Sequence, residues 1–326
     1  MKQIIAGKNE DGQRLDRVLT RLLPNAGKGF IFKMLRKKNI VLNGKKAEGS
    51  ERLTLGDEIK LFFSDETYEI MTSGSKSDLS LLSEDSIIRK MIVYEDDDVI
   101  ILNKPKGVLS QKAAESDISL NEMLISYMLE KGEIDEEQLK TFRPSICNRL
   151  DRNTSGLICG GKSLKGLRGL SEMFRSRELG KYYLCIVKGR VEKQEHIEGY
   201  LEKDEKTNKV SLYSKDIIFE KDNRQGSPIA TEYRPIAYGD GCTLLEVKLL
   251  TGKTHQIRAH LASVGHPIAG DVKYGDERFN RIVRDKHTVK SQMLFAYRMV
   301  FPKDCGELTR LSGKEIILDK PKDFFI

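Results

Sequence analysis

Short stretches with hydrophobic residues at helical spacing come first in the chain, and turn-broken strand patterns follow them. Residues 13–23, QRLDRVLTRLL, and residues 30–39, FIFKMLRKKN, place apolar side chains three and four positions apart, which predicts two amphipathic helices. Residues 40–47, IVLNGKKA, predict a strand, an Asn-Gly turn and a returning strand. Residues 53–63, LTLGDEIKLFF, predict a further strand pair. These elements make a unit of about 60 residues, near the lower size at which domains fold alone.

The pattern becomes polar and serine-rich at residues 64–90, which we expect to form a linker. Beyond it strands dominate, and helices are interspersed without strict alternation, which indicates an α+β domain on a mixed, largely antiparallel sheet. The expected organisation is a small basic α+β domain at 1–63, a linker at 64–90 and a larger domain at 91–326. Strands of the larger domain are expected within 91–104, 181–189, 209–214, 228–238, 243–250, 293–302 and 314–319, and helices within 119–130, 162–179 and 252–267.

Charge is distributed unevenly along the sequence. The 326 residues include 56 Lys and Arg and 49 Asp and Glu, a net charge of +7. Residues 1–60 hold 14 of the basic and 7 of the acidic residues, which leaves 42 of each elsewhere, so this stretch carries the whole excess. Such asymmetry indicates a module that binds a polyanion, although a solvated basic face gives the same count. The basic side chains expected to contact the polyanion are Arg14, Arg17, Lys33, Arg36, Lys37, Lys38 and Lys45.

Composition and cysteine content narrow the class of protein. No apolar run approaches the roughly 20 residues needed to span a bilayer, and the first residues, MKQIIAGKNEDGQR, lack the apolar core of a signal peptide. The five cysteines are odd in number, widely spaced and without a CxxC pair, which argues against a disulfide framework and against a structural zinc site. We therefore expect a soluble protein of the reducing cytoplasm.

Four segments carry candidate chemistry. Residues 148–157, NRLDRNTSGL, hold one carboxylate, Asp151, between two arginines ahead of an apolar stretch. A lone aspartate of this kind is more often a turn residue or a surface ion pair than a catalytic group. The other segments are LNKPKG at 102–107, KYYLCIVKG at 181–189 and TGKTHQIRAHLASVGHPIAGD at 251–271.

The last of these segments contains two histidines that could be metal ligands, His255 and His260. Their spacing of five does not place them on one helical face, and no carboxylate stands between them. We therefore expect no metal site here.

Taken together, the four segments resemble the pseudouridine synthases of the RluA family across residues 91–326. The family motif HRLDxxTSGL appears here as NRLDRNTSGL, KxY as KYY, and HQIR without change. Residues 1–63 resemble the alpha-L RNA-binding domain of the type found in ribosomal small-subunit protein S-four, in GQRLDRVL, the Lys- and Arg-rich helix, VLNGKKA and the Gly56-Asp57 turn. This domain is the usual companion in the family members that act on ribosomal RNA.

The resemblance implies roles for four residues. Asp151 falls on the catalytic aspartate of the family, and Tyr183 on the KxY tyrosine, whose flat face stacks on uracil. Arg258 falls on the HQIR arginine and is expected to lie beside Asp151 and keep it ionised. Arg149 falls on the arginine that replaces a flipped base in its stack. Asn148 stands where the family usually has histidine, a departure that touches no group carrying the reaction.

The implied activity is the isomerisation of specific uridines to pseudouridine by base flipping and an aspartate-dependent mechanism, with no cofactor and no metal. The implied partner is structured RNA, most often large-subunit (23S) ribosomal RNA. Two alternatives stay open: a synthase that modifies transfer RNA, and a non-catalytic RNA-binding protein associated with the ribosome. A metal-dependent RNA hydrolase is disfavoured, because no cluster of histidines or carboxylates has ligand spacing.

Overall fold

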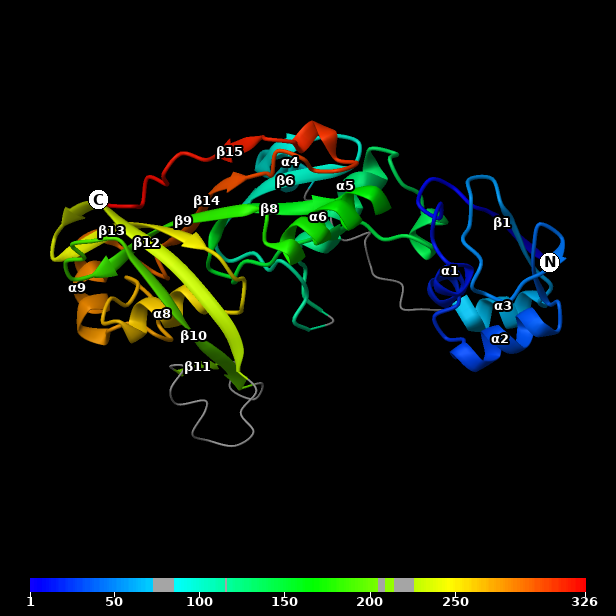
Figure 1. Cartoon of the computed structure of the whole chain (residues 1–326), viewed down its shortest axis with the longest axis horizontal. Coiled ribbons are helices and arrows are strands. Elements are labelled where there is room, and N and C mark those ends of the chain that lie inside the picture. Colours follow the sequence, from blue (N-terminus) through cyan, green and yellow to red (C-terminus); the bar gives the residue numbers. More distant parts are fainter. Residues whose placement is uncertain (73–84, 115, 205–208, 214–225) are drawn as a thin grey trace.

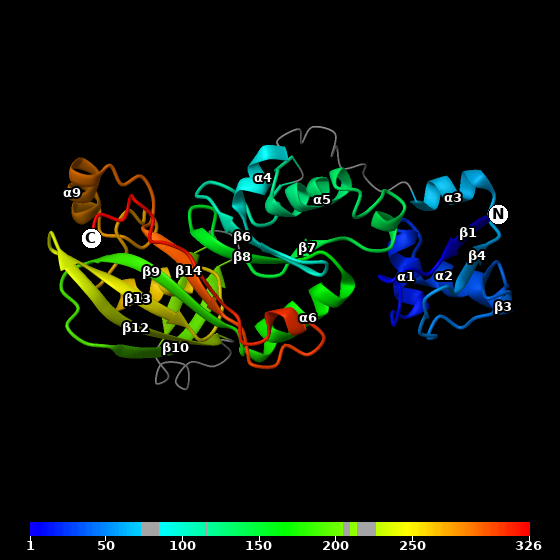
Figure 2. The same ribbon diagram turned by 90° about the horizontal axis from the view of Figure 1, so that it is seen from above.

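The computed structural model describes residues 1–72, 85–114, 116–204, 209–213 and 226–326 (Figure 1). These ranges contain two separate β-sheets, one of four strands near the N-terminus and one of eleven strands in the rest of the chain. The small sheet and its helices lie at one end of an elongated molecule, and the large sheet extends to the other end (Figure 2). Within the described ranges, we find no helix with the length and apolar character needed to cross a bilayer.

The N-terminal unit packs two helices, α1 (Leu15–Leu22) and α2 (Lys28–Arg36), against the small antiparallel sheet. The predicted helices and the predicted hairpin are both confirmed. Asn43 and Gly44 have φ angles of 50° and 70°, the left-handed pair that a two-residue hairpin turn needs. The strands, in spatial order, are β1 (Lys2–Ile5), β4 (Glu58–Leu61), β2 (Ile40–Leu42) and β3 (Lys45–Lys46).

The strand pair predicted at 53–63 is wrong in its first half. Strand β4 forms, but it pairs with β1 and β2, and residues 53–57 form a turn. The Asp57 carboxylate closes this turn, because it accepts the backbone N–H of Thr54 at 2.8 Å and the side-chain amide of Asn43 at 2.9 Å. These side-chain bonds compete with a sheet ladder for the backbone.

Helices occupy both ends of the stretch predicted as a linker, and residues 73–84 between them lie outside the described residues. Helix α3 (Asp65–Thr72) has no buried residue. Helix α4 (Asp85–Met91) instead buries Ile88 and Met91 in the main hydrophobic core. The unit built on the large sheet therefore begins at α4.

The large sheet is mixed and largely antiparallel, as predicted from the sequence, because β8 and β14 are its parallel pair among antiparallel neighbours. Nine strands follow in spatial order, and two more pair at its side. They are β11 (Lys209–Tyr213), β10 (Glu195–Asp204), β12 (Ser227–Gly239), β13 (Cys242–Leu249), β9 (Gly180–Lys188), β14 (Leu294–Val300), β8 (Ser155–Gly161), β6 (Val99–Lys104) and β5 (Ile92–Glu95), with β15 (Glu315–Ile317) on β14 and β7 (Ser145–Ile146) on β8.

Helices flank both faces of this sheet. Alternate residues of β6 illustrate the two layers: Ile100 and Leu102 face the core beneath α4 and α5, whereas Val99 and Ile101 face the core beneath α6. The capping box predicted at the start of α5 is present, since the Glu122 carboxylate accepts the backbone N–H of Ser119 at 3.1 Å. The helices are α5 (Leu120–Glu130), α6 (Leu164–Ser176), α8 (Gln256–Ser263) and α9 (Glu277–His287), with short 3₁₀ turns at Gln138–Lys140 and Thr309–Leu311.

Polar groups join the N-terminal unit to the larger one. The side-chain oxygen of Asn9 accepts the N–H of Leu164 at the start of α6 at 3.0 Å. The Thr141 hydroxyl donates to the buried carboxylate of Glu10 at 2.6 Å, and Arg21 donates to the Thr141 carbonyl at 3.3 Å.

Strands β8 and β14 lie so close together that no side chain fits at one point between them. Gly156 has a φ of +113°, and a Cβ there would lie 2.1 Å from the carbonyl oxygen of Ala296. Because Gly156 lies within the NRLDRNTSGL segment, shortly after Asp151, this contact determines the path of the chain as it leaves Asp151.

Gly156→Ala should therefore destabilise the protein by about 3 kcal/mol or more, because the two strands must separate to admit the methyl group. Gly313→Ala is the matched control: φ is +65°, but no atom lies within 4 Å of its added Cβ, so only backbone strain of about 1 kcal/mol is expected. Urea unfolding followed by circular dichroism measures both losses. Equal losses would show that strain alone, and not close strand packing, explains Gly156.

Candidate active site

A buried lysine from the LNKPKG segment donates a hydrogen bond to the backbone of the NRLDRNTSGL loop. Lys104 is fully buried at the end of β6, and its Nζ donates to the carbonyl oxygens of Pro105 at 3.0 Å, Val108 at 2.9 Å and Arg152 at 3.0 Å. Burial lowers the pKa of Lys104 to about 8, against the opposing effect of the Asp151 charge. Because all three protons are used, Lys104 joins two loops that are 48 residues apart.

Further bonds fix the backbone on both sides of Asp151. The Ser110 hydroxyl donates to the Leu150 carbonyl at 2.9 Å and accepts the Leu150 N–H at 3.1 Å. On the other side, the Arg152 carbonyl accepts the N–H of Gly107 at 2.9 Å, and Arg152 Nε donates to the Gly107 carbonyl at 3.0 Å. The loop is therefore preorganised before any ligand binds.

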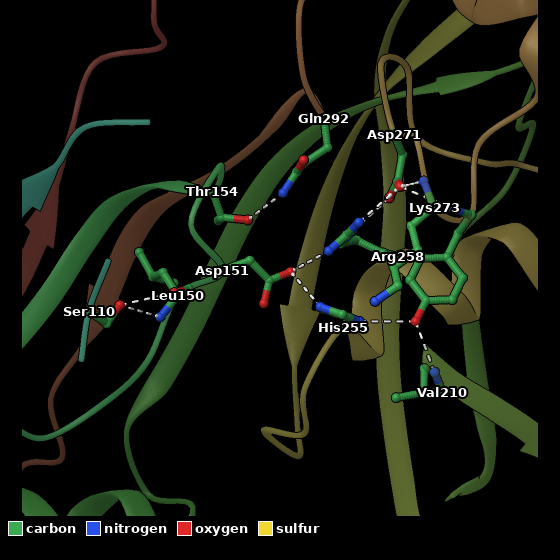
Figure 3. Close-up of polar contacts among 11 residues, drawn as sticks. Ser110, Leu150, Asp151, Thr154, Val210, His255, Arg258, Asp271, Lys273 and Gln292 are labelled. Atoms are coloured by element: carbon green, nitrogen blue, oxygen red, sulfur yellow. Dashed lines mark hydrogen bonds and ion pairs between the residues drawn. The ribbon is translucent and has the colours of Figure 1, made fainter. Parts of the chain in front are cut away.

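The Asp151 side chain meets Arg258, which α8 supplies (Figure 3). Arg258 Nη1 donates to Asp151 Oδ2 at 2.7 Å. The rest of the guanidinium is held by Asp271, with Nε to Oδ2 at 2.6 Å and Nη2 to Oδ1 at 2.9 Å. The guanidinium thus bridges two carboxylates, one fully buried and one with 23% of its side chain exposed.

Arg258 and Asp271 stabilise each other's charged forms. Burial by itself lowers the pKa of Arg258, but the bond to Asp271 and then the Asp151 charge raise it above its ordinary value. Burial likewise disfavours the Asp271 carboxylate, yet the Arg258 guanidinium holds the pKa of Asp271 below its usual range. The backbone N–H groups of Lys273 and Tyr274 add hydrogen bonds to Asp271 at 2.8 and 3.1 Å.

The arginines that flank Asp151 in the sequence do not pair with it. Arg152 bonds the backbone of Gly107, as described above. Arg149 is exposed, lines the same cleft as Asp151, and makes no hydrogen bond or ion pair with any residue that the structure describes. Its guanidinium is therefore available to a ligand.

His255 lies next to the carboxylate and also orients a tyrosine. Its Nε2 is 3.9 Å from Asp151 Oδ2, and its Nδ1 is 3.0 Å from the Tyr274 hydroxyl. Burial lowers the pKa of His255, with Asp151 opposing, which favours the neutral imidazole. His260 lies elsewhere, bonded to Thr231 at 2.8 Å. Within the described ranges, no group of three or more metal-type side chains comes together.

Tyr183 and Asp151 both line an open cavity of about 1070 Å³. Tyr183 is buried on β9, where burial and then the Asp151 charge raise the pKa of its phenol, so the hydroxyl stays protonated at neutral pH. Tyr182, one position earlier, faces the other side of the sheet, where the Arg298 guanidinium lies 3.8 Å from its ring centre. The alternation of the strand thus selects Tyr183 for the cavity.

The cavity is strongly basic. Asp151 is the one acidic side chain among the described residues that line it, against nine basic ones. These are Lys112, Arg149, Arg152, Arg177, Lys181, Lys203, Lys253, Arg258 and Lys273. Such a surface attracts a polyanion toward the carboxylate.

The basic residues predicted in the N-terminal unit lie outside this cavity, and all of them are exposed. Arg14 is already paired, because it donates to both carboxylate oxygens of Asp16 at 3.0 and 2.9 Å. The others are Arg17, Lys33, Arg36, Lys37, Lys38 and Lys45.

Sequence reasoning did not single out Asp271 or Lys104, although both lie inside quoted segments. Lys104 is separated from the apolar run Val99–Leu102 by the polar Asn103, so no clear signal in the sequence marks this lysine as buried. Asp271 ends the 251–271 segment, and only the fold shows that it holds Arg258. Asn148, in the position of the usual histidine, accepts the Cys159 N–H at 2.7 Å and so has a structural contact.

Comparison with known proteins finds relatives over most of the chain. Residues 98–263 match the family model described as RNA pseudouridylate synthase. An uncharacterized RNA pseudouridine synthase of Mycoplasma genitalium is 30% identical over 305 residues, 92% of this chain and 89% of that protein. The ribosomal large subunit pseudouridine synthase C of Vibrio cholerae is 31% identical over 275 residues, which are 82% of this chain and 79% of that protein. Human RNA pseudouridylate synthase domain containing 4 shares the fold, with a TM-score of 0.56 at 17% identity over 74% of this chain and 92% of that chain.

Asp271→Ala should destabilise the protein by about 3–5 kcal/mol, because it leaves the buried Arg258 without its main partner. Asp97→Ala removes an exposed aspartate 3.4 Å from Arg310 and should change stability by about 0.5 kcal/mol or less. The pKa of Asp271 is depressed in the folded state, so its contribution is present above the ordinary carboxyl pKa of about 4 and is lost as pH falls below it. Urea unfolding at several pH values measures the free energy of unfolding of wild type and of each variant. The difference between wild type and Asp271→Ala should shrink in acid, and a difference that widens there would contradict the role of Asp271.

Proposed function

Since this chain belongs to the RNA pseudouridylate synthase family, of the RluA type, we propose that it isomerises uridines in large-subunit ribosomal RNA with Asp151 as the catalytic carboxylate. The observation that carries this proposal is the position of Asp151. It is the acidic side chain of a basic cavity, and one of its oxygens is bonded to the Arg258–Asp271 pair.

The two oxygens of Asp151 have different surroundings, which suggests how it acts. Oδ2 accepts the bond from Arg258, whereas Oδ1 accepts no hydrogen bond from a described residue and stays available to a substrate (Figure 3). Pseudouridine formation breaks the bond between ribose C1′ and uracil N1, turns the base and joins C1′ to C5. C5 loses its proton to solvent and N1 gains one, so the product is an isomer of the substrate. Oδ1 either attacks the ribose or ring, or removes a ribose proton, while Arg258 holds the carboxylate in place.

The uridine must leave its stack to reach this position. Tyr183 offers a flat, buried face beside Asp151, and stacking a base on it contributes about 1–3 kcal/mol. Arg149 stands exposed at the cavity without a partner in the described chain, so it can occupy the space that the flipped base leaves.

The choice of ribosomal RNA rests on relatives and on charge. The Vibrio cholerae relative is named for the ribosomal large subunit. We propose that residues 1–63 form a separate domain that grips structured RNA through its exposed basic side chains, with residues 64–90 linking it to the catalytic domain at 91–326. Each phosphate contact then adds a salt-dependent increment to affinity.

RNA from a strain lacking this protein should lose pseudouridine at one or more positions of large-subunit ribosomal RNA. Wild-type protein should restore them, and Asp151→Asn should not, although it keeps shape and hydrogen-bonding capacity. Carbodiimide-based primer extension maps the positions, and tritium release from RNA labelled at uracil C5 gives the rates. Turnover by Asp151→Asn within tenfold of wild type would refute the catalytic role, and loss of pseudouridine from transfer RNA instead would refute the substrate class.

Arg258→Lys and Arg149→Ala should fail in different ways. Arg258→Lys keeps a charge but loses the fork that bonds Asp271 and Asp151 together, so it should slow the chemical step equally on every RNA. Arg149→Ala should slow modification mainly when the uridine is stacked, because flipping then costs a few kcal/mol.

Single-turnover rates on a folded RNA and on a short RNA with an unstacked target separate the two, provided that wild type modifies both. Equal Arg149→Ala defects on the two substrates would contradict the base-replacing role.

A further inference from the structure

One buried lysine in the cavity has no anionic or hydrogen-bonding partner among the described residues, and its Nζ instead lies 6.0 Å from the ring centre of Phe174. Lys181 lies on β9 two positions before Tyr183, so both side chains leave the same face of the strand and both line the cavity. Only 8% of Lys181 is exposed. It makes no hydrogen bond or ion pair with any described residue. The Nζ of Lys181 reaches the exposed Gly252, which also lines the cavity: a Cβ added to Gly252 would lie 3.8 Å from it.

The other two buried lysines of the described chain show how unusual this is. Lys104 donates to three carbonyl oxygens, as described above. Lys162 lies 2.6 Å from a Glu95 oxygen and 2.8 Å from a Glu133 oxygen. Lys181 has only the distant Phe174 ring in place of such partners, which is less favourable for a mostly buried side chain.

A second cation, Arg177, makes the environment of Lys181 still less favourable. Burial lowers the pKa of Lys181, and the positive charge of Arg177 lowers it further. Arg177 ends α6 in the left-handed region, with φ at +63°, a position that glycine occupies with least strain. Arg177 also lines the cavity and forms no hydrogen bond or ion pair with a described residue. Two cations thus line one cavity. Burial disfavours the charge of Lys181, and the backbone conformation of Arg177 is strained.

We propose that Lys181 and Arg177 form a phosphate subsite, which binds a backbone phosphodiester of the RNA next to the uridine that Tyr183 and Asp151 receive. A phosphate supplies the negative charge and the acceptor oxygens that the two cations lack. The subsite rests on the proposed function for the identity of its RNA. Its position fits a role in drawing the target nucleotide toward Tyr183, because the lysine and the tyrosine share one strand face.

Binding of an oligouridylate of about 12 nucleotides tests the subsite without requiring turnover. The variants are Lys181→Met, which keeps length but removes charge, Lys181→Arg, which keeps charge, and Arg177→Gly, which also relieves the backbone. Lys303→Met is the matched control. It removes the same charge, but Lys303 is exposed and lies outside the cavity lining. Fluorescence anisotropy between about 50 and 300 mM KCl gives Kd and its salt dependence.

Lys181→Met should weaken binding about tenfold or more and lower the slope of log affinity against log salt by roughly 0.7. Arg177→Gly should act in the same direction, Lys181→Arg should retain the wild-type slope, and Lys303→Met should resemble wild type. The melting temperatures of Lys181→Met and Arg177→Gly should equal or exceed that of wild type, because each change removes an unfavourable feature. A lysine with a purely structural role would instead lower the melting temperature and leave the slope unchanged.

The subsite is overturned if Lys181→Met keeps the wild-type slope, if Lys303→Met lowers it equally, or if Lys181→Met melts well below wild type. These readouts are independent of the reaction. Altered salt dependence without any pseudouridine formed by the wild type would support the subsite and refute the proposed function. Pseudouridine formation with unaltered salt dependence would do the reverse.

Discussion

The site depends on one guanidinium shared between two carboxylates of unequal exposure. Arg258 gives two of its nitrogens to the buried Asp271 and a third to Asp151, whose side chain reaches the cavity. A lysine can present only one point charge and cannot bridge in this planar manner. Asp271 neutralises most of the burial penalty of the arginine, and Asp151 is then oriented by a group that cannot rotate. The short helix α8, the turn before Lys273 and the loop at Asp151 must all be placed for this arrangement to exist.

The loop that carries Asp151 is held in position by hydrogen bonds to its backbone as much as by ion pairs. Lys104, Ser110 and Gly107 bond the main chain on either side of the aspartate and leave its side chain free of local partners. The two arginines that flank Asp151 in the sequence therefore have different contacts. Arg152 closes the loop through its contact with Gly107, whereas Arg149 is left to the cavity. Sequence proximity of opposite charges was a poor guide to pairing here, because the turn points the neighbouring side chains in different directions.

Much of the fold could be predicted from periodicity, and the reasons for the failures are local. The Asn43-Gly44 hairpin and the α5 capping box have specific residue signatures, and both are present. Strand β10 was not predicted, because Glu195–Asp204 is rich in charged residues and buries little besides Gly199 and Leu201. Helix α9 was not predicted either, since Glu277–His287 has few apolar residues among many charges. In the site, the resemblance of three segments to the RluA family motifs pointed to Asp151, Tyr183 and Arg258. Asp271 and Lys181 required the fold, because their importance lies in which partner each has or lacks.

The position of β14 in the sheet has a consequence for synthesis of the protein. This strand comes from near the end of the described chain, yet it lies between β8, which follows Asp151, and β9, which carries Tyr183. The two strands are therefore joined by a segment that leaves the ribosome after both of them. Arg258 and Asp271 also emerge more than 100 residues after Asp151. A nascent chain held on the ribosome can fold its N-terminal helices early, but it cannot complete the sheet or the carboxylate pair. The bridge from Asp271 through Arg258 to Asp151 is thus unavailable to a chain that has not yet been translated through β14.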